Sequence, residues 1–380
     1  MKTSRDRILT THVGSLPRGA ELVETLLAKD RGDYDAARHE AIVHQAVLDA
    51  VAKQKTVGID IPSDGEAGKV SYSTYMMDRL TGFGGDNERR VALDLKDYPE
   101  FREKMARVTG KQEFRRSSCI GPIAVKDMMP LETDIANMTA GLKASGIEEG
   151  FLNSASPGLV TAFQPNKFYP SHEAYLEALA KAMAPEYRMI VDAGLILQLD
   201  CPDLAMARHI AFQDLDEATF LRRAALHVEA LNAALGDIPR EKVRLHICWG
   251  NYEGPHDFDI PVAKILPIVL KANAQALLFE GANARHEHEW KVWAEAKLPD
   301  DLILVPGTID TCSNYVEHPE LIAERIERYA KIVGRERVIA GTDCGFGTFA
   351  GYGKLDAGIA YKKLAALVEG AAIASKRLWA

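Results

Sequence analysis

Short apolar runs alternate along the chain with longer segments that have the periodicity of helices. Eight of the runs are nearly continuous in apolar residues, which is typical of strands buried on both faces, as in a parallel sheet. The predicted strands are Ile8–Gly14, Gly58–Asp64, Gly150–Ser154, Leu195–Asp200, Val243–Cys248, Ala276–Glu280, Leu302–Pro306 and Val338–Asp343.

The segments between the runs predict amphipathic helices. The clearest begins after Ser171, a residue type that caps helix N-termini, and its apolar residues recur at steps of three and four. These residues are Leu176, Leu179, Met183, Tyr187 and Ile190. Eight strands alternating with helices in 380 residues predict an α/β protein, a (β/α)₈ TIM barrel that forms a single catalytic domain over residues 1–380. A doubly wound sheet is the alternative.

One stretch breaks the alternation. Roughly Gly68 to Phe114 is rich in glycine and charge and follows the second predicted strand. We expect a long excursion there, with a hairpin near Cys119–Ala124. Long excursions in barrels often cover the active site, so this one is a candidate lid.

Composition narrows the class of protein. The net charge is −8 and no basic stripe is visible, which argues against nucleic acid and anionic membranes as partners. The chain contains no apolar run of membrane-spanning length, and its first ten residues lack the apolar core of a secretory signal. Its five cysteines are odd in number and widely spread, which argues against a disulfide framework. We therefore expect a cytoplasmic protein.

Reactive side chains follow most of the predicted strands. Active sites of (β/α)₈ barrels lie at the carboxyl ends of the strands, so these side chains are expected to share one rim. The reactive segments are Thr10–Pro17, Ser63–Glu66, Asp200–Asp203, His246–Cys248, Glu280, Asp310 and Asp343–Gly345.

Three of these residues suit a metal. His246 and Cys248 are two apart on a predicted strand, so their side chains point to the same face. Cys344, and also Glu280, can reach them from other strand ends. Two thiolates and an imidazole suit zinc, and three protein ligands leave a position open for catalysis.

Simpler interpretations of the cysteines and histidines compete with a metal site. A single cysteine is often only a small buried apolar residue, and we expect this of Cys119 and Cys312. The segment Arg285–Glu289 has the composition of a metal site, but at a helix start it is better explained as a solvated charged face.

Glu66, Asp200 and Ser15 are candidates for binding a substrate. Two carboxylates at a barrel rim can hold a substrate ammonium group or act in acid–base catalysis, or they can be hydrogen-bonded parts of the rim. Ser15 follows Gly14 in a tight turn whose backbone N–H groups could receive a carboxylate or phosphate. A role for His12 in proton transfer is less favoured.

Several of these segments together resemble the C-terminal, catalytic half of cobalamin-independent methionine synthase. The matching pieces are Thr10–Pro17, Gly65–Glu66, Leu197–Asp200, His246–Cys248, Phe279–Glu280 and Thr342–Gly345, in the family's order. The resemblance implies a barrel that binds zinc through His246, Cys248, Glu280 and Cys344. It also implies that Ser15, Glu66 and Asp200 bind homocysteine.

Other features differ from the long synthases. The chain has no room for their extra N-terminal domain, and Cys201 stands where they have glutamate after the aspartate. The segment Asn153–Tyr169 also differs. In these features the chain is more similar to short single-domain relatives, which include the zinc enzyme that joins epoxides to the thiol coenzyme M.

The combined expectation is a zinc-dependent thiol S-methyltransferase. It would activate its acceptor as a zinc thiolate, with homocysteine as the leading acceptor and methionine as the product. Methylfolate or a methylcorrinoid protein would be the methyl donor. The alternatives are alkylation of another thiol, for example by an epoxide, and a non-catalytic zinc-binding barrel. The sequence is compatible with a homo-oligomer.

Overall fold

A computed structural model describes residues 1–88, 90–110, 115–353 and 355–380. Its centre is a parallel sheet of seven strands in the order β1-β9-β8-β7-β6-β5-β4. The strands are β1 (Leu9–Thr10), β4 (Phe151–Ala155), β5 (Ile196–Asp200), β6 (Val243–His246), β7 (Ala276–Phe279), β8 (Ile303–Ile309) and β9 (Ile339–Thr342).

The segment around Ile61–Ser63 closes this sheet. Thr11 forms a parallel bridge to Ile61, and Ser63 forms one to Phe151 at the start of β4. The backbone N–H of Phe151 also donates to the carbonyl oxygen of Pro62, at 3.0 Å. The seven strands and this segment together give eight parallel positions, so the predicted (β/α)₈ barrel is confirmed. Each position overlaps one of the eight runs expected from the sequence, although β4 and β8 extend past the predicted ends of their runs.

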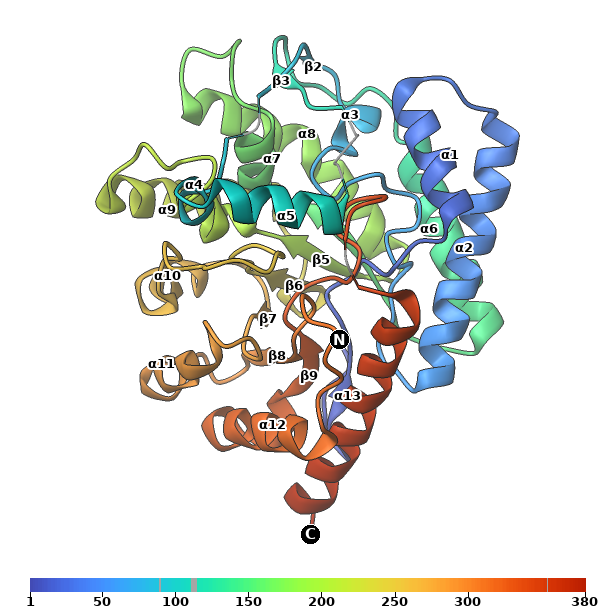
Figure 1. Ribbon diagram of the computed structural model, residues 1–380, viewed down its shortest axis with the longest axis vertical. Helices are drawn as coiled ribbons and strands as arrows, with labels where there is room; N and C mark the ends of the chain where they lie inside the picture. Colours follow the sequence, from blue (N-terminus) through green and yellow to red (C-terminus); the bar gives the residue numbers. More distant parts are fainter. Residues whose placement is uncertain (89, 111–114, 354) are drawn as a thin grey trace.

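Helices cover the outside of the barrel (Figure 1). Capping fixes their starts: α8 begins after Ser171, whose hydroxyl accepts from the Ala174 N–H at 3.1 Å. The outer helices are α1 (Ala20–Arg31), α2 (Ala36–Val57), α6 (Met129–Ser145), α7 (Pro157–Phe163), α8 (His172–Asp192), α9 (Glu217–Leu235), α10 (Val262–Val269), α11 (Trp290–Glu295), α12 (Pro319–Val333) and α13 (Ala357–Leu378). Short 3₁₀ turns are η1 (Pro202–Leu204), η2 (Met206–Arg208), η3 (Arg240–Lys242), η4 (Glu287–Glu289) and η5 (Arg335–Arg337).

The barrel interior is packed rather than open. Its apolar side chains are Val13, Ile61, Phe151, Ile196, Ala276, Leu278, Ile303, Val305 and Ile339. Arg244 is also fully buried, with its guanidinium 3.5 Å from the centroid of the Phe151 ring and a hydrogen bond to the His12 carbonyl at 2.9 Å. Arg244 and His246 alternate along β6 with outward residues, so both face inward. The strand therefore turns His246 toward the same interior, one step nearer its carboxyl end.

The excursion after the second strand position folds into short elements. They are α3 (Met76–Arg79), β2 (Phe83–Gly84), α4 (Leu93–Lys96), α5 (Pro99–Thr109) and β3 (Ser118–Cys119). In Figure 1, α5 crosses the view in front of the sheet. Phe114, where the excursion was expected to end, lies outside the described residues.

The expected hairpin at Cys119–Ala124 is wrong in its pairing. Cys119 pairs antiparallel with Phe83, which lies far upstream in the excursion. Gly82 has a φ of +89°, and its carbonyl oxygen accepts from the N–H groups of both Ile120 and Gly121. The segment therefore takes its partner from residues 80–84, and no local turn is needed.

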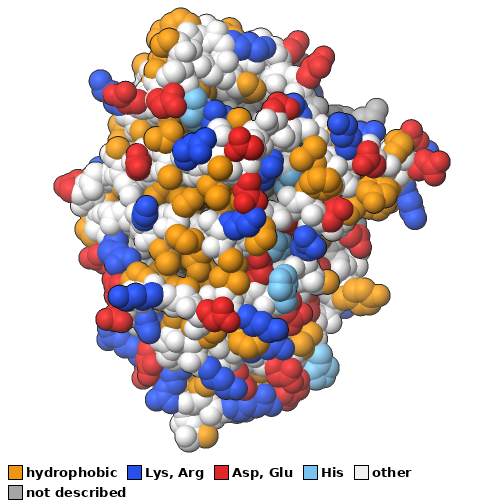
Figure 2. All heavy atoms as spheres, turned by 90° about the vertical axis from the view of Figure 1, so that its left-hand side faces the viewer, with side chains coloured by type: hydrophobic (Ala, Val, Ile, Leu, Met, Phe, Trp, Pro, Cys, Tyr) orange, Lys and Arg blue, Asp and Glu red, His pale blue; other side chains and the backbone are white. Residues whose placement is uncertain are grey.

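The surface carries charges of both signs. Figure 2 shows acidic and basic side chains interspersed over one face, with hydrophobic side chains between them. Within the described ranges, no helix combines the length and the apolar character needed to cross a membrane.

Candidate active site

His246, Cys248 and Cys344 meet at the carboxyl-terminal rim of the barrel. His246 ends β6, Cys248 follows it, and Cys344 follows β9. One potential ligand atom from each of the three lies within 4.8 Å of the others, and the two Sγ atoms are 3.7 Å apart. The side chains are 3%, 7% and 8% exposed. The structure thus brings together residues that are up to 98 positions apart in the sequence.

The imidazole of His246 fits a metal ligand. Both ring nitrogens are buried, and neither has a hydrogen-bond partner among the described residues. Burial lowers the pKa of His246 to about 3, so the ring is neutral and keeps a lone pair for bonding. Buried polar atoms without a partner are unfavourable, and a metal ion would supply the missing bond. The two neighbouring thiols complete a donor set that suits zinc.

Glu280 lies beside this group without belonging to it. It follows β7, and its carboxylate accepts from the Trp249 N–H at 2.8 Å and from Asn283 Nδ2 at 2.7 Å. It is not among the residues whose ligand atoms cluster within 4.8 Å. Burial raises the pKa of Glu280. Hydrogen bonds therefore hold the carboxylate close to the group of His246, Cys248 and Cys344.

Asp343 fixes the loop that carries Cys344. Its carboxylate accepts four hydrogen bonds, from the N–H groups of Gly281, Ala282 and Asn283 at 2.8 Å and from Asn283 Nδ2 at 3.0 Å. These bonds join the end of β9 to the loop after β7. Because Asn283 also donates to Glu280, it links the two acids.

Glu66 has strained backbone and an unpaired carboxylate oxygen. Its φ is +54°, a conformation that non-glycine residues rarely adopt and that clusters at functional sites. Its Oε2 atom is buried with no partner among the described residues, and burial raises its pKa to about 7. Arg18 donates to the Glu66 carbonyl oxygen at 2.8 Å and helps to hold this turn.

Asp200 is held by two amide side chains that sequence reasoning missed. Asn153 Nδ2 lies 3.2 and 3.0 Å from the two carboxylate oxygens, and Gln198 Nε2 donates at 3.1 Å. Burial raises the pKa of Asp200 to about 6. Asn153 lies on β4, and the sequence signal for it is a polar residue inside a buried strand.

Lys69 is a further residue whose place in the site the sequence did not reveal. Its ammonium group is buried, donates to the Asn153 carbonyl oxygen at 2.6 Å and lies 4.4 Å from the centroid of the Tyr75 ring. Its positive charge lowers the pKa of both Glu66 and Asp200, against the larger effect of burial. The two acids therefore share a buried countercharge.

Ser15 packs against the loop that follows Cys344. Its carbonyl oxygen accepts from the Phe346 N–H at 2.8 Å, and a Cβ atom added at Gly345 would lie 2.0 Å from its hydroxyl oxygen. Only glycine fits this approach. The contact places Ser15 next to one of the clustered thiols.

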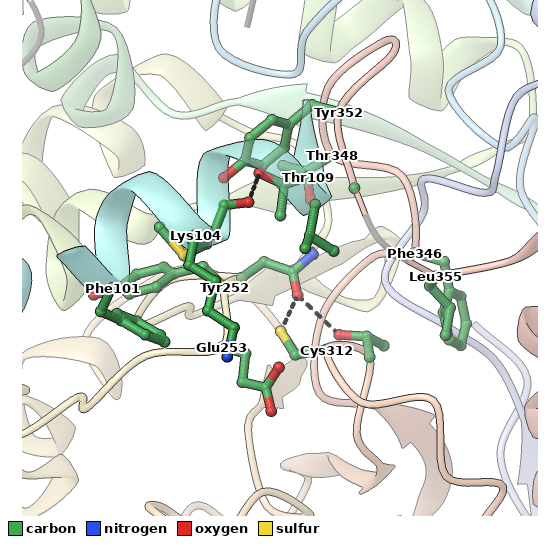
Figure 3. A pocket seen from close by; sticks show the side chains of 15 residues that line it. Phe101, Lys104, Thr109, Tyr252, Glu253, Cys312, Phe346, Thr348, Tyr352 and Leu355 are labelled. Carbon is green, nitrogen blue, oxygen red and sulfur yellow. Dashed lines mark hydrogen bonds between the residues drawn. The ribbon is translucent and has the colours of Figure 1, made fainter. Parts of the chain in front are cut away.

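Six of these side chains line one cavity of about 640 Å³. Its wall includes Ser15, Glu66, Asp200, His246, Cys248 and Cys344, with Leu95, Met105 and Thr109 contributed by the excursion. Apolar and aromatic side chains form much of the rest, namely Tyr72, Phe163, Met206, Phe212, Phe349 and Tyr352. A smaller cavity of about 350 Å³ also borders α5 (Figure 3).

Comparison with known proteins supports the resemblance seen in the sequence. Residues 8–93 match the family model described as the catalytic domain of cobalamin-independent synthase. Methionine synthases of Sulfolobus acidocaldarius and Thermococcus kodakarensis are each 25% identical over 372 residues, which is 97% of this chain and 93% and 94% of theirs. A B12-independent methionine synthase from Shewanella sp. W3-18-1, solved with selenomethionine, superimposes with a TM-score of 0.72 at 20% identity, covering 98% of this chain and 99% of that one.

The chain is thus similar to cobalamin-independent methionine synthases. The relation extends over nearly the whole chain, and the barrel is the fold that the relatives share.

Two other residues singled out in the sequence have structural partners. His12 donates to Gln54 Oε1 at 2.6 Å through Nε2, and its Nδ1 accepts from the Gly14 N–H, so both nitrogens are occupied. Burial lowers its pKa to about 4. Cys119 lies away from the rim and bonds to the Gly121 carbonyl oxygen at 3.4 Å. Neither residue belongs to the cluster of His246, Cys248 and Cys344.

The expectation of a solvated charged face at Arg285–Glu289 is wrong for two residues. His286 and Glu289 are buried, because η4 turns positions three apart toward the same side, where His286 packs on Trp249. His286 donates to Glu289 Oε2 at 2.8 Å and to Asp259 Oδ2 at 3.0 Å. The segment is an internal ion cluster behind the rim.

This cluster predicts a pH-dependent stability. Burial lowers the pKa of His286, but hydrogen bonds to Asp259 and Glu289 outweigh burial and raise the pKa to about 10. A histidine in the unfolded chain has a pKa of about 6.5, so the stabilisation is complete below that pH and is lost as pH rises toward 10. We expect the wild type to have a higher free energy of unfolding than His286→Asn at pH 6.5. This difference should shrink by roughly 2 kcal/mol or more between pH 6.5 and 10.

Urea unfolding at several pH values measures this difference. His39→Asn is the control, because burial lowers the pKa of His39 and its removal should not reproduce the trend. A constant difference between wild type and His286→Asn across the range would contradict the prediction.

Proposed function

We propose that the protein is a zinc-dependent thiol S-methyltransferase that methylates homocysteine to methionine. One observation carries the proposal: His246, Cys248 and Cys344 share a cavity wall with Glu66 and Asp200. A metal-binding group thus faces the same space as two carboxylates that can receive an amino group. The relation to methionine synthases supports the same chemistry.

His246, Cys248 and Cys344 would hold the zinc, with Glu280 as a fourth protein ligand when no substrate is bound. Bound zinc lowers the pKa of a thiol substrate, so that the thiol is deprotonated and nucleophilic at neutral pH. A set of three firm protein ligands is typical of catalytic zinc sites, whereas structural sites usually have four. The unpaired nitrogens of His246 support a metal at this point of the rim.

The acidic residues would orient the acceptor. The unpaired Glu66 Oε2 can accept from the substrate ammonium group, and the amides of Asn153 and Gln198 keep Asp200 in place to accept from it as well. Ser15 and the neighbouring backbone would receive the carboxylate. This arrangement favours an amino-acid thiol over a sulfonate thiol, since acids face the acceptor position.

The methyl donor would occupy the apolar part of the cavity, under α5. Methylfolate and a methylcorrinoid protein are the two donors included in the proposal. We further propose that residues 1–380 act as one catalytic domain, because β1 near the start of the chain pairs with β9 near its end. Closing the barrel therefore needs both ends of the chain.

Metal analysis is the first test. Purified wild-type protein should contain about one zinc per chain, as expected for a single catalytic site. Cys248→Ser should lose it, because serine is a far weaker zinc ligand than a thiolate. Cys119→Ser is the matched control and should keep the metal, since Cys119 lies outside the group. Wild-type protein without zinc after growth with added zinc would refute the metal centre.

A substrate panel tests the acceptor. We expect the protein to form a thioether from homocysteine and a methyl donor, and to form little thioether from a sulfonate thiol. Mass spectrometry detects the products. Glu66→Gln should raise the KM for homocysteine about 10- to 100-fold, because it removes a charged hydrogen bond worth ~1.5–3 kcal/mol.

The control for Glu66→Gln is Glu217→Gln, which removes a carboxylate from the surface, where it pairs with Lys264. Its KM should match the wild type. If homocysteine is inert with every methyl donor while another thiol reacts, the proposed acceptor is wrong but the zinc chemistry stands.

A further inference from the structure

Asn251 makes an unusually complete set of hydrogen bonds at the rim. It lies in the loop after β6, three positions beyond Cys248. Its Nδ2 donates to the Gly345 carbonyl oxygen at 2.7 Å and to Thr348 Oγ1 at 2.8 Å. Its Oδ1 accepts from Thr311 Oγ1 and from Cys312 Sγ, each at 3.0 Å. The bond to Cys312 is one of the dashed lines in Figure 3.

These four bonds reach the loops that follow two other strands. Thr311 and Cys312 belong to the loop after β8, and Gly345 and Thr348 belong to the loop after β9. An asparagine amide has two N–H donors and two acceptor lone pairs, and Asn251 uses all four. One side chain therefore ties the loop of Cys248 to the loops after β8 and β9.

The bond to Gly345 is the important one for the metal. Gly345 directly follows Cys344, while Asn251 closely follows Cys248, so this bond spans the two thiols. The Gly250 N–H, between Cys248 and Asn251 in the chain, also donates to Cys248 Sγ at 3.3 Å. Hydrogen bonds thus hold the loops that carry the two Sγ atoms, which lie 3.7 Å apart.

We infer that Asn251 is a positioning residue for the metal centre. It sets the distance between Cys248 and Cys344 by fastening their loops together, and it does not itself belong to the clustered ligand group. The inference rests on the proposed function, since it assumes that the two thiols bind the metal. Residues that orient metal ligands through hydrogen bonds typically change metal affinity about 10- to 100-fold when replaced.

Substitution can separate the donor bonds of the Asn251 amide from its acceptor bonds. Asn251→Ala removes all four bonds. Asn251→Asp keeps the acceptors for Thr311 and Cys312 but places a carboxylate oxygen against the Gly345 carbonyl, so it loses the bond that spans the thiols. If that bond sets the thiol spacing, both variants should weaken metal binding. If Asn251 served only to hold the β8 loop, Asn251→Asp would bind metal as the wild type does.

The experiment measures zinc affinity by competition with a chelator, and the absorption bands of the cobalt(II)-loaded protein. We expect Asn251→Ala and Asn251→Asp to bind zinc about 10- to 100-fold more weakly, with shifted cobalt bands. Asn87→Ala is the matched control: Asn87 also lines the cavity, but its amide donates to the Phe163 carbonyl oxygen, away from the thiols. It should keep wild-type zinc affinity.

The possible results separate the two claims. Wild-type protein that binds no metal overturns the proposed function and the positioning role with it. Wild-type binding with equal affinity in Asn251→Ala overturns the positioning role alone. If Asn251→Ala does not fold, Thr348→Val removes a single partner of the amide, and it should shift the cobalt bands toward those of Asn251→Asp. Unchanged bands in Thr348→Val and unchanged affinity in Asn251→Asp would refute the inference.

Discussion

Closure of the parallel sheet is the constraint on which the rest of the structure depends. Because all eight strand positions run in one direction, their carboxyl ends form a single rim, and residues far apart in the sequence become neighbours. Closure itself rests on few backbone bonds, those of the short segment at Ile61–Ser63 between β1 and β4. The same segment leads directly into Glu66, whose left-handed backbone turns the carboxylate into the cavity. The pairing that completes the barrel therefore also delivers one wall of the site.

The rim collects polar atoms that the fold leaves without partners. Glu66 Oε2, Thr74 Oγ1 and both nitrogens of His246 are buried and unpaired among the described residues, and all three side chains line the main cavity. Each such atom lowers stability relative to a satisfied one, so their concentration in one place calls for an explanation. A ligand that brings a cation to His246 and donors to Glu66 would satisfy them together. The metal and ammonium sites that we propose have this chemistry.

Sequence periodicity predicted the barrel because buried strands and amphipathic helices leave patterns within a few residues. The rim residues could be expected for the same reason, since a strand end is a local feature. Asn153, Lys69 and Asn251 could not, because each acquires its role from partners on other strands. Asn251 looks like an ordinary loop asparagine until Gly345 is known to lie 2.7 Å from it. The prediction for His286 and Glu289 was wrong for the opposite reason. Their charges suggested exposure to solvent, whereas tertiary contacts with Asp259 and Trp249 bury this pair.

The charges of Glu66, Asp200 and Lys69 bear on which thiol substrate fits the cavity. Glu66 and Asp200 carry two negative charges when ionised, and Lys69 supplies one positive charge that is already engaged with the Asn153 carbonyl oxygen. Arg18 also lowers the pKa of Glu66, and Arg244 that of Asp200, yet burial outweighs these positive charges and raises the pKa of both acids. An ammonium group in the cavity would favour the ionised forms of both acids, whereas an anion would disfavour them. The wall that carries Glu66 and Asp200 therefore favours a ligand with a positive charge, such as the amino group of an amino-acid thiol.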